Sequence, residues 1–171
     1  MDDSIKNRER AFGRIYDENI NPIYRFVLLR VNSKEAAEDL VSETFLKGWE
    51  AFRQAGAAIE NPRAFLYKIA KNMVVDHYRE KGRTTVVSAE GRADELADPR
   101  VDVAQSAAVN ADMEAVRKAI AGLNDDYQNA IIWRYLDEMP IKEIAGLLDR
   151  SEEATRVLIH RAMKELRMRL A

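Results

Sequence analysis

Apolar residues recur at intervals of three and four along most of this chain, the spacing that places them on one face of an α-helix. The pattern covers residues 5–31, 33–54 and 62–80, and it resumes near residue 105 and continues towards the C-terminus. No segment shows the strict alternation of apolar and polar residues that is typical of a half-buried β-strand. We therefore expect an all-α protein.

Short polar residues and prolines mark where these helices begin. Asn32 or Ser33 precedes the second apolar pattern, and Asn61 followed by Pro62 precedes the third. Asparagine and serine are favoured caps, and proline is favoured at the first helical position. Three further start signals lie in the second half of the chain: Asn124, Pro140 and Ser151.

The stretch 84–104 separates two helical halves. It is acidic, rich in small residues and aperiodic, and we interpret it as a flexible linker. We predict two small helical domains, 1–83 and 105–171. Within the first domain, Pro22 is expected to break or restart the first helix, and Gly82 to end the third.

Charge is distributed unevenly, although the formal net charge is only −2. Residues 61–83 carry six Lys or Arg against two Asp or Glu, whereas residues 84–115 carry seven acidic side chains against two basic ones. Residues 154–171 carry five basic side chains and one acidic one. The low net charge therefore conceals two cationic surfaces.

Several classes of protein are disfavoured by what the chain lacks. It has no cysteine, so it forms no disulfides, thiolate metal sites or thiol nucleophiles. Its two histidines, His77 and His160, lie far apart, and no glycine-rich phosphate loop is present. No apolar run approaches the roughly 18 residues that cross a bilayer. We expect a cytoplasmic protein that is not an enzyme and holds no metal or cofactor.

The last predicted helix has two unlike faces. Its apolar residues fall on one side, and "DRS" before it supplies the tight turn of a helix-turn-helix. Cationic residues on the exposed side suit phosphates and guanine edges in the DNA major groove. A three-helix bundle with a solvated charged face remains an alternative. The exposed side is predicted to carry Arg156, Val157, His160, Arg161 and Lys164.

The helix over 62–80 is also two-faced. One side is apolar, and tyrosines are interleaved with cations on the other, an arrangement that suits single-stranded nucleic acid because bases stack on aromatic rings. Alternatively, the tyrosines lie at the edge of the core with only their hydroxyls exposed. The second side is predicted to carry Tyr67, Lys68, Lys71, Asn72, Tyr78 and Arg79.

The helix over 33–54 combines exposed apolar groups with carboxylates. Such a surface suits a protein partner that offers basic side chains and an apolar pocket. The alternative is that Trp49 packs against the first helix. The predicted docking residues are Asp39, Ser42, Glu43, Leu46 and Trp49.

Taken in chain order, the three surfaces resemble those of an extracytoplasmic-function (ECF) sigma factor of bacterial RNA polymerase. "AEDLVSETFLKGWEAF" is similar to the family's region 2.2, and "NPRAFLYKIAKNMVVDHYREKGR" resembles regions 2.3 and 2.4. "AIAGLNDDYQNAIIWRYLDEMPIKEIAGLLDRSEEATRVLIHRAMKEL" resembles region 4. Together these segments cover well over half of the chain, in family order and spacing.

The resemblance implies a role for each surface. The helix over 33–54 would bind the clamp coiled coil of core RNA polymerase, and the last helix would read the −35 element of promoter DNA. The acidic linker would thread the polymerase interior, the loop at about 80–88 would capture a flipped −10 base, and an anti-sigma factor is a further partner. The −10 DNA would meet Tyr67, Lys68, Lys71, Asn72, Arg79, Lys81 and Arg83.

The chain departs from the family pattern around its last two helices. The family commonly has glycine and an aliphatic residue where Asp149 and Arg150 stand, and "GTVKSRL" where this chain has "EATRVLI". Leu158 replaces a usual arginine, and Glu153 replaces a usual glycine. The −35 sequence therefore cannot be inferred from the family.

Two other functions fit parts of the sequence. A sigma-like decoy would bind an anti-sigma factor without initiating transcription, but it would not need basic faces on both domains. A simple helix-turn-helix regulator would need only residues 105–171, and it would leave the docking surface of residues 39–49 unexplained.

Overall fold

The computed structural model describes residues 2–84 and 106–171, and every element in these two ranges is helical, which confirms the all-α prediction. The chain divides into two compact units, Met1–Glu95 and Leu96–Ala171. The predicted linker lies outside the described residues apart from Thr84, which ends a helix. The described helices include none that is both long enough and apolar enough to cross a membrane.

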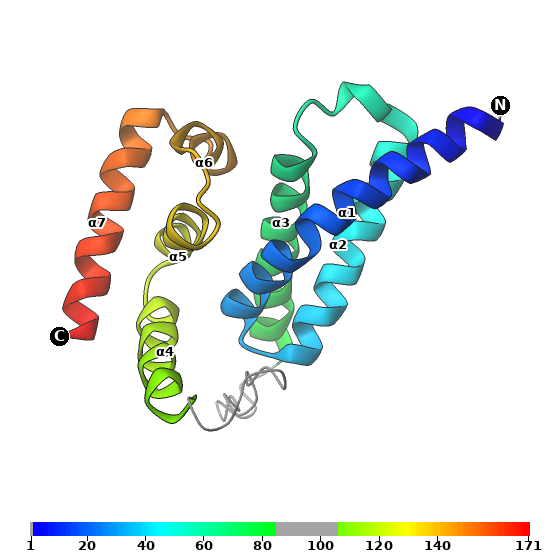
Figure 1. Cartoon of the computed structure of the whole chain (residues 1–171). Helices are drawn as coiled ribbons and strands as arrows, with labels where there is room; N and C mark the ends of the chain where they lie inside the picture. Colours follow the sequence, from blue (N-terminus) through cyan, green and yellow to red (C-terminus); the bar gives the residue numbers. More distant parts are fainter. Residues whose placement is uncertain (1, 85–105) are drawn as a thin grey trace. The chain divides into compact units, whose positions relative to one another are not determined.

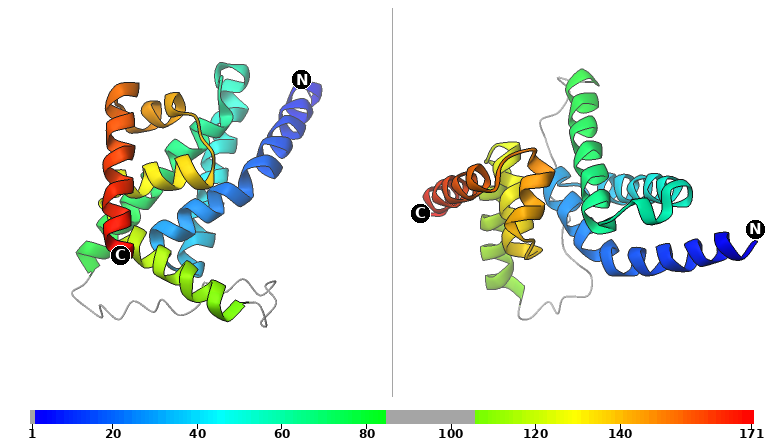
Figure 2. Two further views of the ribbon diagram at one scale, coloured as in Figure 1. Left: turned by 60° about the vertical axis from the view of Figure 1, so that its left-hand side comes forward. Right: turned by 90° about the horizontal axis from the view of Figure 1, so that it is seen from above.

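The first unit is a bundle of three long helices (Figure 1). They are α1 (Asp2–Val31), α2 (Lys34–Ala55) and α3 (Pro62–Thr84), with a short 3₁₀ turn, η1 (Gly56–Ala58), after α2. Each long helix packs against the other two. The first turns of α1 extend past the bundle, as the two views in Figure 2 also show.

Side-chain caps begin α2 and α3 as predicted. Ser33 caps α2, because its hydroxyl accepts a hydrogen bond from the amide of Ala36 at 3.2 Å. Asn61 caps α3 in the same way, accepting from the amide of Ala64 at 3.1 Å. Asn32, the other candidate, has a φ of 55° and lies in the left-handed conformation that follows α1.

Two predicted helix breaks are wrong. Pro22 lies inside α1, which continues to Val31. The helix after Pro22 is held by burial, because Ile23 and Phe26 are both fully enclosed, and this packing outweighs the hydrogen bond that proline cannot donate. Gly82 lies inside α3, where it is exposed, and a glycine at such a position costs a helix only about 1 kcal/mol.

The core of the first unit corrects one predicted site residue. Tyr67 is only 1% exposed, so its predicted place on the open face of α3 is wrong, and it is buried more deeply than the alternative of an edge tyrosine with an exposed hydroxyl. Its ring packs edge-on against Phe26 of α1, with ring centroids 5.8 Å apart. The other enclosed apolar side chains are Ile23, Val27, Val31, Ala37, Val41, Phe45, Leu66, Ala70, Met73 and Val74.

Helices α2 and α3 approach closely at Gly48. A Cβ atom at this position would lie 2.6 Å from Cδ2 of Leu66, which is itself fully buried in α3. Real Cβ atoms do not come this close to another heavy atom. The absence of a side chain at Gly48 therefore leaves room for the Leu66 side chain of α3 against α2.

The second unit is built from shorter helices. They are α4 (Ser106–Ala121), α5 (Asp125–Ile131), the π-helical turn η2 (Ile132–Leu136), α6 (Ile141–Leu148) and α7 (Glu152–Leu170). α7 packs along α4, α5 and α6 (Figure 1). The core of the second unit contains Ile120, Leu123, Ile131, Ile132, Trp133, Met139, Ile144, Leu148, Leu158, Ile159, Ala162 and Leu166.

The predicted start signals of the second unit are confirmed. Asn124 caps α5, its side chain accepting from the amide of Tyr127 at 2.9 Å. Ser151 caps α7 by accepting from the amide of Ala154 at 3.1 Å. Pro140 precedes α6 without a side-chain cap.

We predict that Tyr67→Ala strongly destabilises the first unit. Removing a fully buried aromatic side chain typically costs about 3–5 kcal/mol. Thermal and urea denaturation, followed by far-UV circular dichroism, would measure the loss. Tyr67→Phe keeps the ring against Phe26 and should cost much less, and Lys68→Ala, an exposed neighbour, should cost almost nothing. Near-equal stability of Tyr67→Ala and Lys68→Ala would contradict the burial of this tyrosine.

Candidate functional site

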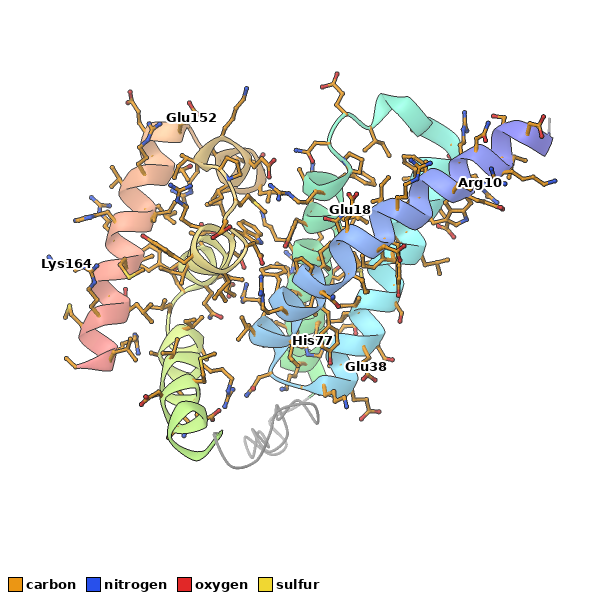
Figure 3. The ribbon with its side chains drawn as sticks, in the orientation of Figure 1. Arg10, Glu18, Glu38, His77, Glu152 and Lys164 are labelled. Atoms are coloured by element: carbon orange, nitrogen blue, oxygen red, sulfur yellow. The ribbon has the colours of Figure 1, made fainter. Side chains whose placement is uncertain are left out.

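The outward face of α7 carries the cations predicted from the sequence. Its side chains are exposed, whereas the apolar arc, including Leu158, faces the core. Lys164 projects from the side of α7 that faces away from α5 (Figure 3). Ala154 and Leu170 are two of the apolar residues that the helical spacing places on the inner side, and both are exposed instead. The exposed face consists of Arg156, Val157, His160, Arg161 and Lys164, and we call it the α7 face.

A tightly bonded turn positions this face. Asp149 ends α6 in the left-handed conformation, with φ 53° and ψ 44°. The amide of Arg150 then donates to the carbonyl of Ala145 at 3.0 Å. The Thr155 hydroxyl donates to the carbonyl of Ser151 at 2.8 Å, which adds a second bond to the Ser151 cap. The turn between α6 and α7 is therefore fixed on both sides.

A hollow of about 720 Å³ lies beside the α7 face. It extends from the N-terminus of α5 across the turn to α7, so two residues of the α7 face, Val157 and Arg161, form part of its wall. The same wall contains an ion pair in which the guanidinium of Arg150 lies 2.9 Å from the Asp126 carboxylate. The remaining lining residues are Asn124, Asp125, Tyr127, Ala154 and Leu158.

The exposed face of α3 is cationic but less aromatic than predicted. Lys68, Asn72, Arg79 and Lys81 are exposed, and Lys71 is half-buried. The structure does not describe the side chain of Arg83. We call Lys68, Lys71, Asn72, Arg79 and Lys81 the α3 face.

The tyrosines contribute less to this face than the sequence suggested. Tyr67 belongs to the core, because Phe26 of α1 covers its ring. Tyr78 is 42% exposed, and its hydroxyl donates to the backbone carbonyl of Arg30 in α1. Tyr78 therefore lies at the edge of the core, as in the alternative, but its hydroxyl is bonded to the backbone, whereas the alternative expected only the hydroxyl to be exposed. It leaves part of its ring accessible.

His77 lies on α3 next to this region (Figure 3). Burial lowers the pKa of His77 below its ordinary value, and the nearby positive charge of Lys81 lowers it further, against a smaller opposite effect of Glu80. The imidazole is consequently neutral at pH 7. The positive charge near the α3 face thus comes from lysine and arginine alone.

On α2, the predicted docking residues are mostly exposed. Asp39, Ser42 and Glu43 are open to solvent, and Leu46 is 57% exposed. Trp49 is half-buried, because its ring packs against Phe12 of α1 with centroids 5.4 Å apart. The alternative in which Trp49 packs on the first helix therefore holds for part of its surface. We call Asp39, Ser42, Glu43, Leu46 and Trp49 the α2 surface.

Lys47 is a residue of this region that helical periodicity did not identify. Its ammonium lies 3.6 Å from the Glu43 carboxylate, one helical turn away. It also donates to the sulfur of Met73 in α3 at 3.6 Å. Lys47 thus links the α2 surface to α3. The charge and spacing of Glu43 and Lys47 could have revealed the ion pair, but the contact with α3 depends on the tertiary fold.

The residues that the structure describes contain no group of three His, Asp or Glu side chains that could hold a metal ion. The α2 surface and the α3 face belong to one three-helix unit, whereas the α7 face belongs to the other.

Two family models match the chain. The model of Sigma-70 region 2 matches residues 15–84, which contain the α2 surface and the α3 face. The model of Sigma-70, region 4 matches residues 113–166, which contain the helix-turn-helix and the α7 face.

Similar sequences are named as sigma factors. The ECF RNA polymerase sigma factor BldN of Streptomyces coelicolor is 35% identical over 162 residues, which cover 91% of this chain and 59% of BldN. This chain thus spans somewhat less than two thirds of BldN. The ECF RNA polymerase sigma factor SigM of Bacillus subtilis is 27% identical over 158 residues, which cover 92% of this chain and 93% of SigM.

Solved structures share the fold. RpoE of Bartonella quintana, solved with the anti-sigma factor NepR, aligns with a TM-score of 0.73 at 21% identity over 94% of this chain and 97% of RpoE. CnrH, solved with the cytosolic domain of CnrY, aligns with a TM-score of 0.67 at 20% identity, over 94% of this chain and 87% of CnrH.

The two family matches fall on the two helical units in the order that the sequence predicted, and together with the similarity to BldN and SigM they show the family. The chain belongs to the sigma-70 family as an ECF RNA polymerase sigma factor.

Proposed function

We propose that this chain binds core RNA polymerase and directs promoter recognition, opening of the −10 region and initiation of transcription. The observation that carries the proposal is that three exposed surfaces are distributed over two units. The α2 surface and the α3 face lie on the first unit, and the α7 face lies on the second. A sigma factor needs one surface for polymerase and two for DNA. The role requires binding and no catalysis, and it places the protein where bacterial polymerase acts, in the cytoplasm.

The α2 surface is proposed to dock on the clamp coiled coil of core polymerase. Asp39 and Glu43 are one helical turn apart and can meet basic side chains, and the exposed Leu46 can enter an apolar groove. Such acids contribute little to folding while they are exposed, because surface ion pairs are worth about 0–1 kcal/mol. At a desolvated interface the same groups matter much more, since truncating one partner typically costs about 2–5 kcal/mol.

The α3 face is proposed to contact the −10 DNA. Lys68, Arg79 and Lys81 are exposed cations that can bind phosphates, and Asn72 can hydrogen-bond to an unstacked base. Because Tyr67 is buried, Tyr78 is the tyrosine of this helix whose ring is partly exposed. Residues 80–84 of the predicted base-capturing loop near residues 80–88 are helical and form the end of α3, and residues 85–88 lie outside the described residues.

The α7 face is proposed to bind the −35 element. Arg156, Arg161 and Lys164 can bind phosphates or guanine edges, and Val157 can contact a thymine methyl group. A three-helix bundle whose charged face only meets solvent would show the same exposed cations. The position of the α7 face on the second helix of a helix-turn-helix favours the DNA-binding interpretation.

An anti-sigma factor is a further proposed partner. CnrH and RpoE, which share the fold, were both solved with a partner of their own, named as an anti-sigma factor in the case of RpoE. A decoy that only bound such a factor would not need the α3 face. A simple regulator would not need the α2 surface.

We predict that the protein enables core polymerase to initiate at defined sites. Purified core enzyme would be mixed with fragmented bacterial genomic DNA, and the 5′ ends of the transcripts would be mapped with and without the protein. New, discrete start sites are expected only when both are present. If no start sites appear although the protein binds core polymerase, the decoy interpretation is favoured. Tight, sequence-specific DNA binding by the protein alone would instead favour a simple regulator.

We predict that Asp39→Ala combined with Leu46→Ala weakens binding to core polymerase by at least tenfold, or about 1.4 kcal/mol or more. Both side chains are exposed, so the melting temperature should hardly change. Biolayer interferometry with immobilised core enzyme would measure the affinity. The matched control is Asp3→Ala with Ile5→Ala, which removes the same kinds of exposed group from α1. Equal affinities of the two variants would exclude the α2 surface as the dock.

We predict that Lys71→Ala with Asn72→Ala impairs promoter opening more than formation of the closed complex. These residues lie on the α3 face, which would meet bases only after the strands separate. Permanganate reactivity of thymines in the −10 region would report opening, and a gel-shift assay at low temperature would report closed-complex formation. A template with a pre-melted −10 region should restore activity. Failure of that template to rescue the variant would assign these residues to another step.

A further inference from the structure

The ion pair between Asp126 and Arg150 joins two elements that are distant in sequence. Asp126 lies in the first turn of α5, and Arg150 lies in the turn between α6 and α7. The guanidinium donates to the carboxylate at 2.9 Å. Both side chains remain nearly half exposed, at 45% for Arg150 and 42% for Asp126. Water and other ions therefore compete for both partners.

The pair lies beside the proposed DNA-binding surface. Asp126 and Arg150 line the same hollow as Val157 and Arg161 of the α7 face. Arg150 immediately precedes Ser151, the residue that caps α7. A duplex bound against the α7 face would bring its phosphates to the edge of this hollow, where Arg150 is a cation and Asp126 a repelling anion.

We propose that Arg150 binds a DNA phosphate and that Asp126, by holding the guanidinium in the free protein, limits the affinity of the α7 face for DNA. This inference rests on the proposed −35 role of that face. It assigns the protein a phosphate-binding residue outside the α7 face and an acidic residue that opposes it.

The exchange of partners requires only a movement of the Arg150 side chain. The backbone at this residue is already held, because its amide donates to the Ala145 carbonyl and Ser151 caps the next helix. An exposed ion pair is weak, so a phosphate can displace the carboxylate. A guanidinium also matches a phosphate geometrically, since it can donate two parallel hydrogen bonds.

The turn does not need the ion pair to keep its shape. Asp149 in the left-handed conformation, the Ala145 carbonyl and the Ser151 cap already define the path of the chain. Replacing Asp126 with its isostere asparagine should therefore release Arg150 without moving α7.

The test measures binding of the full chain to a labelled, mixed-sequence duplex of about 30 base pairs, roughly three helical turns. A phosphate contact does not depend on sequence, so this probe suffices. Fluorescence anisotropy would be recorded from about 50 to 200 mM NaCl for the wild type, Asp126→Asn, Arg150→Ala and the double variant. Asp112→Asn is the matched control, because it removes one exposed carboxylate from α4. Arg156→Ala reports on the α7 face itself.

Asp126→Asn is expected to tighten binding about two- to fivefold, because this factor corresponds to the free energy of an exposed ion pair. Arg150→Ala is expected to weaken binding and to reduce the slope of log affinity against log salt by up to about 0.9. In the Arg150→Ala background, Asp126→Asn should change affinity little, and Asp112→Asn should have little effect throughout. Melting temperatures should stay within a few degrees of the wild type.

Three results would overturn the proposal. If Asp126→Asn tightened binding equally with and without Arg150, the carboxylate would act by general repulsion and not through the guanidinium. If Arg150→Ala and Asp126→Asn had no effect while Arg156→Ala weakened binding, the α7 face would bind DNA without Arg150. Loss of the Arg156→Ala effect as well would remove the −35 role, and the present inference with it.

Discussion

Each helix of the two units buries a narrow apolar stripe in a small core, and this requirement decides which residues remain available to partners. In the first unit the stripe of α3 includes Leu66, Tyr67 and Val74, which leaves Lys68 and Asn72 outside. In the second unit Leu158 and Ala162 hold α7 in place. The opposite side of each helix is thereby presented in one orientation, and the surfaces that suit polymerase and DNA are the outward sides of core-forming helices.

Local signals predicted the helix starts and the faces of α2 and α7 because both depend on neighbouring residues. Ser33, Asn61, Asn124 and Ser151 all cap the helices that follow them. Caps are made by a side chain and an amide only two or three residues away. The inner and outer sides of α7 follow in the same way from a repeat of 3.6 residues per turn.

Two predictions, for Tyr67 and for Pro22, failed because of contacts between helices, and one ion pair between helices was not predicted at all. Tyr67 lies at the margin of its helical stripe, and only the position of Phe26 in α1 shows that it is enclosed. Pro22 does not break α1, because the burial of the residues that follow it outweighs the hydrogen bond that proline cannot donate. The ion pair between Asp126 and Arg150 joins residues 24 positions apart, which no helical repeat brings into register. Tertiary packing decided each of these cases.

The contact at Gly48 has a consequence for how the protein can change over generations. Gly48 lies in α2 between Leu46 and Trp49, and a side chain there would strike Leu66 in α3. Any larger residue would force a shift of the Leu66 side chain, and so disturb the packing between the helix that is proposed to dock on polymerase and the helix that is proposed to meet the −10 DNA. Variation at this one position would therefore act on both helices at once. The two surfaces can diversify freely on their outer sides, but their spacing is constrained as a single trait.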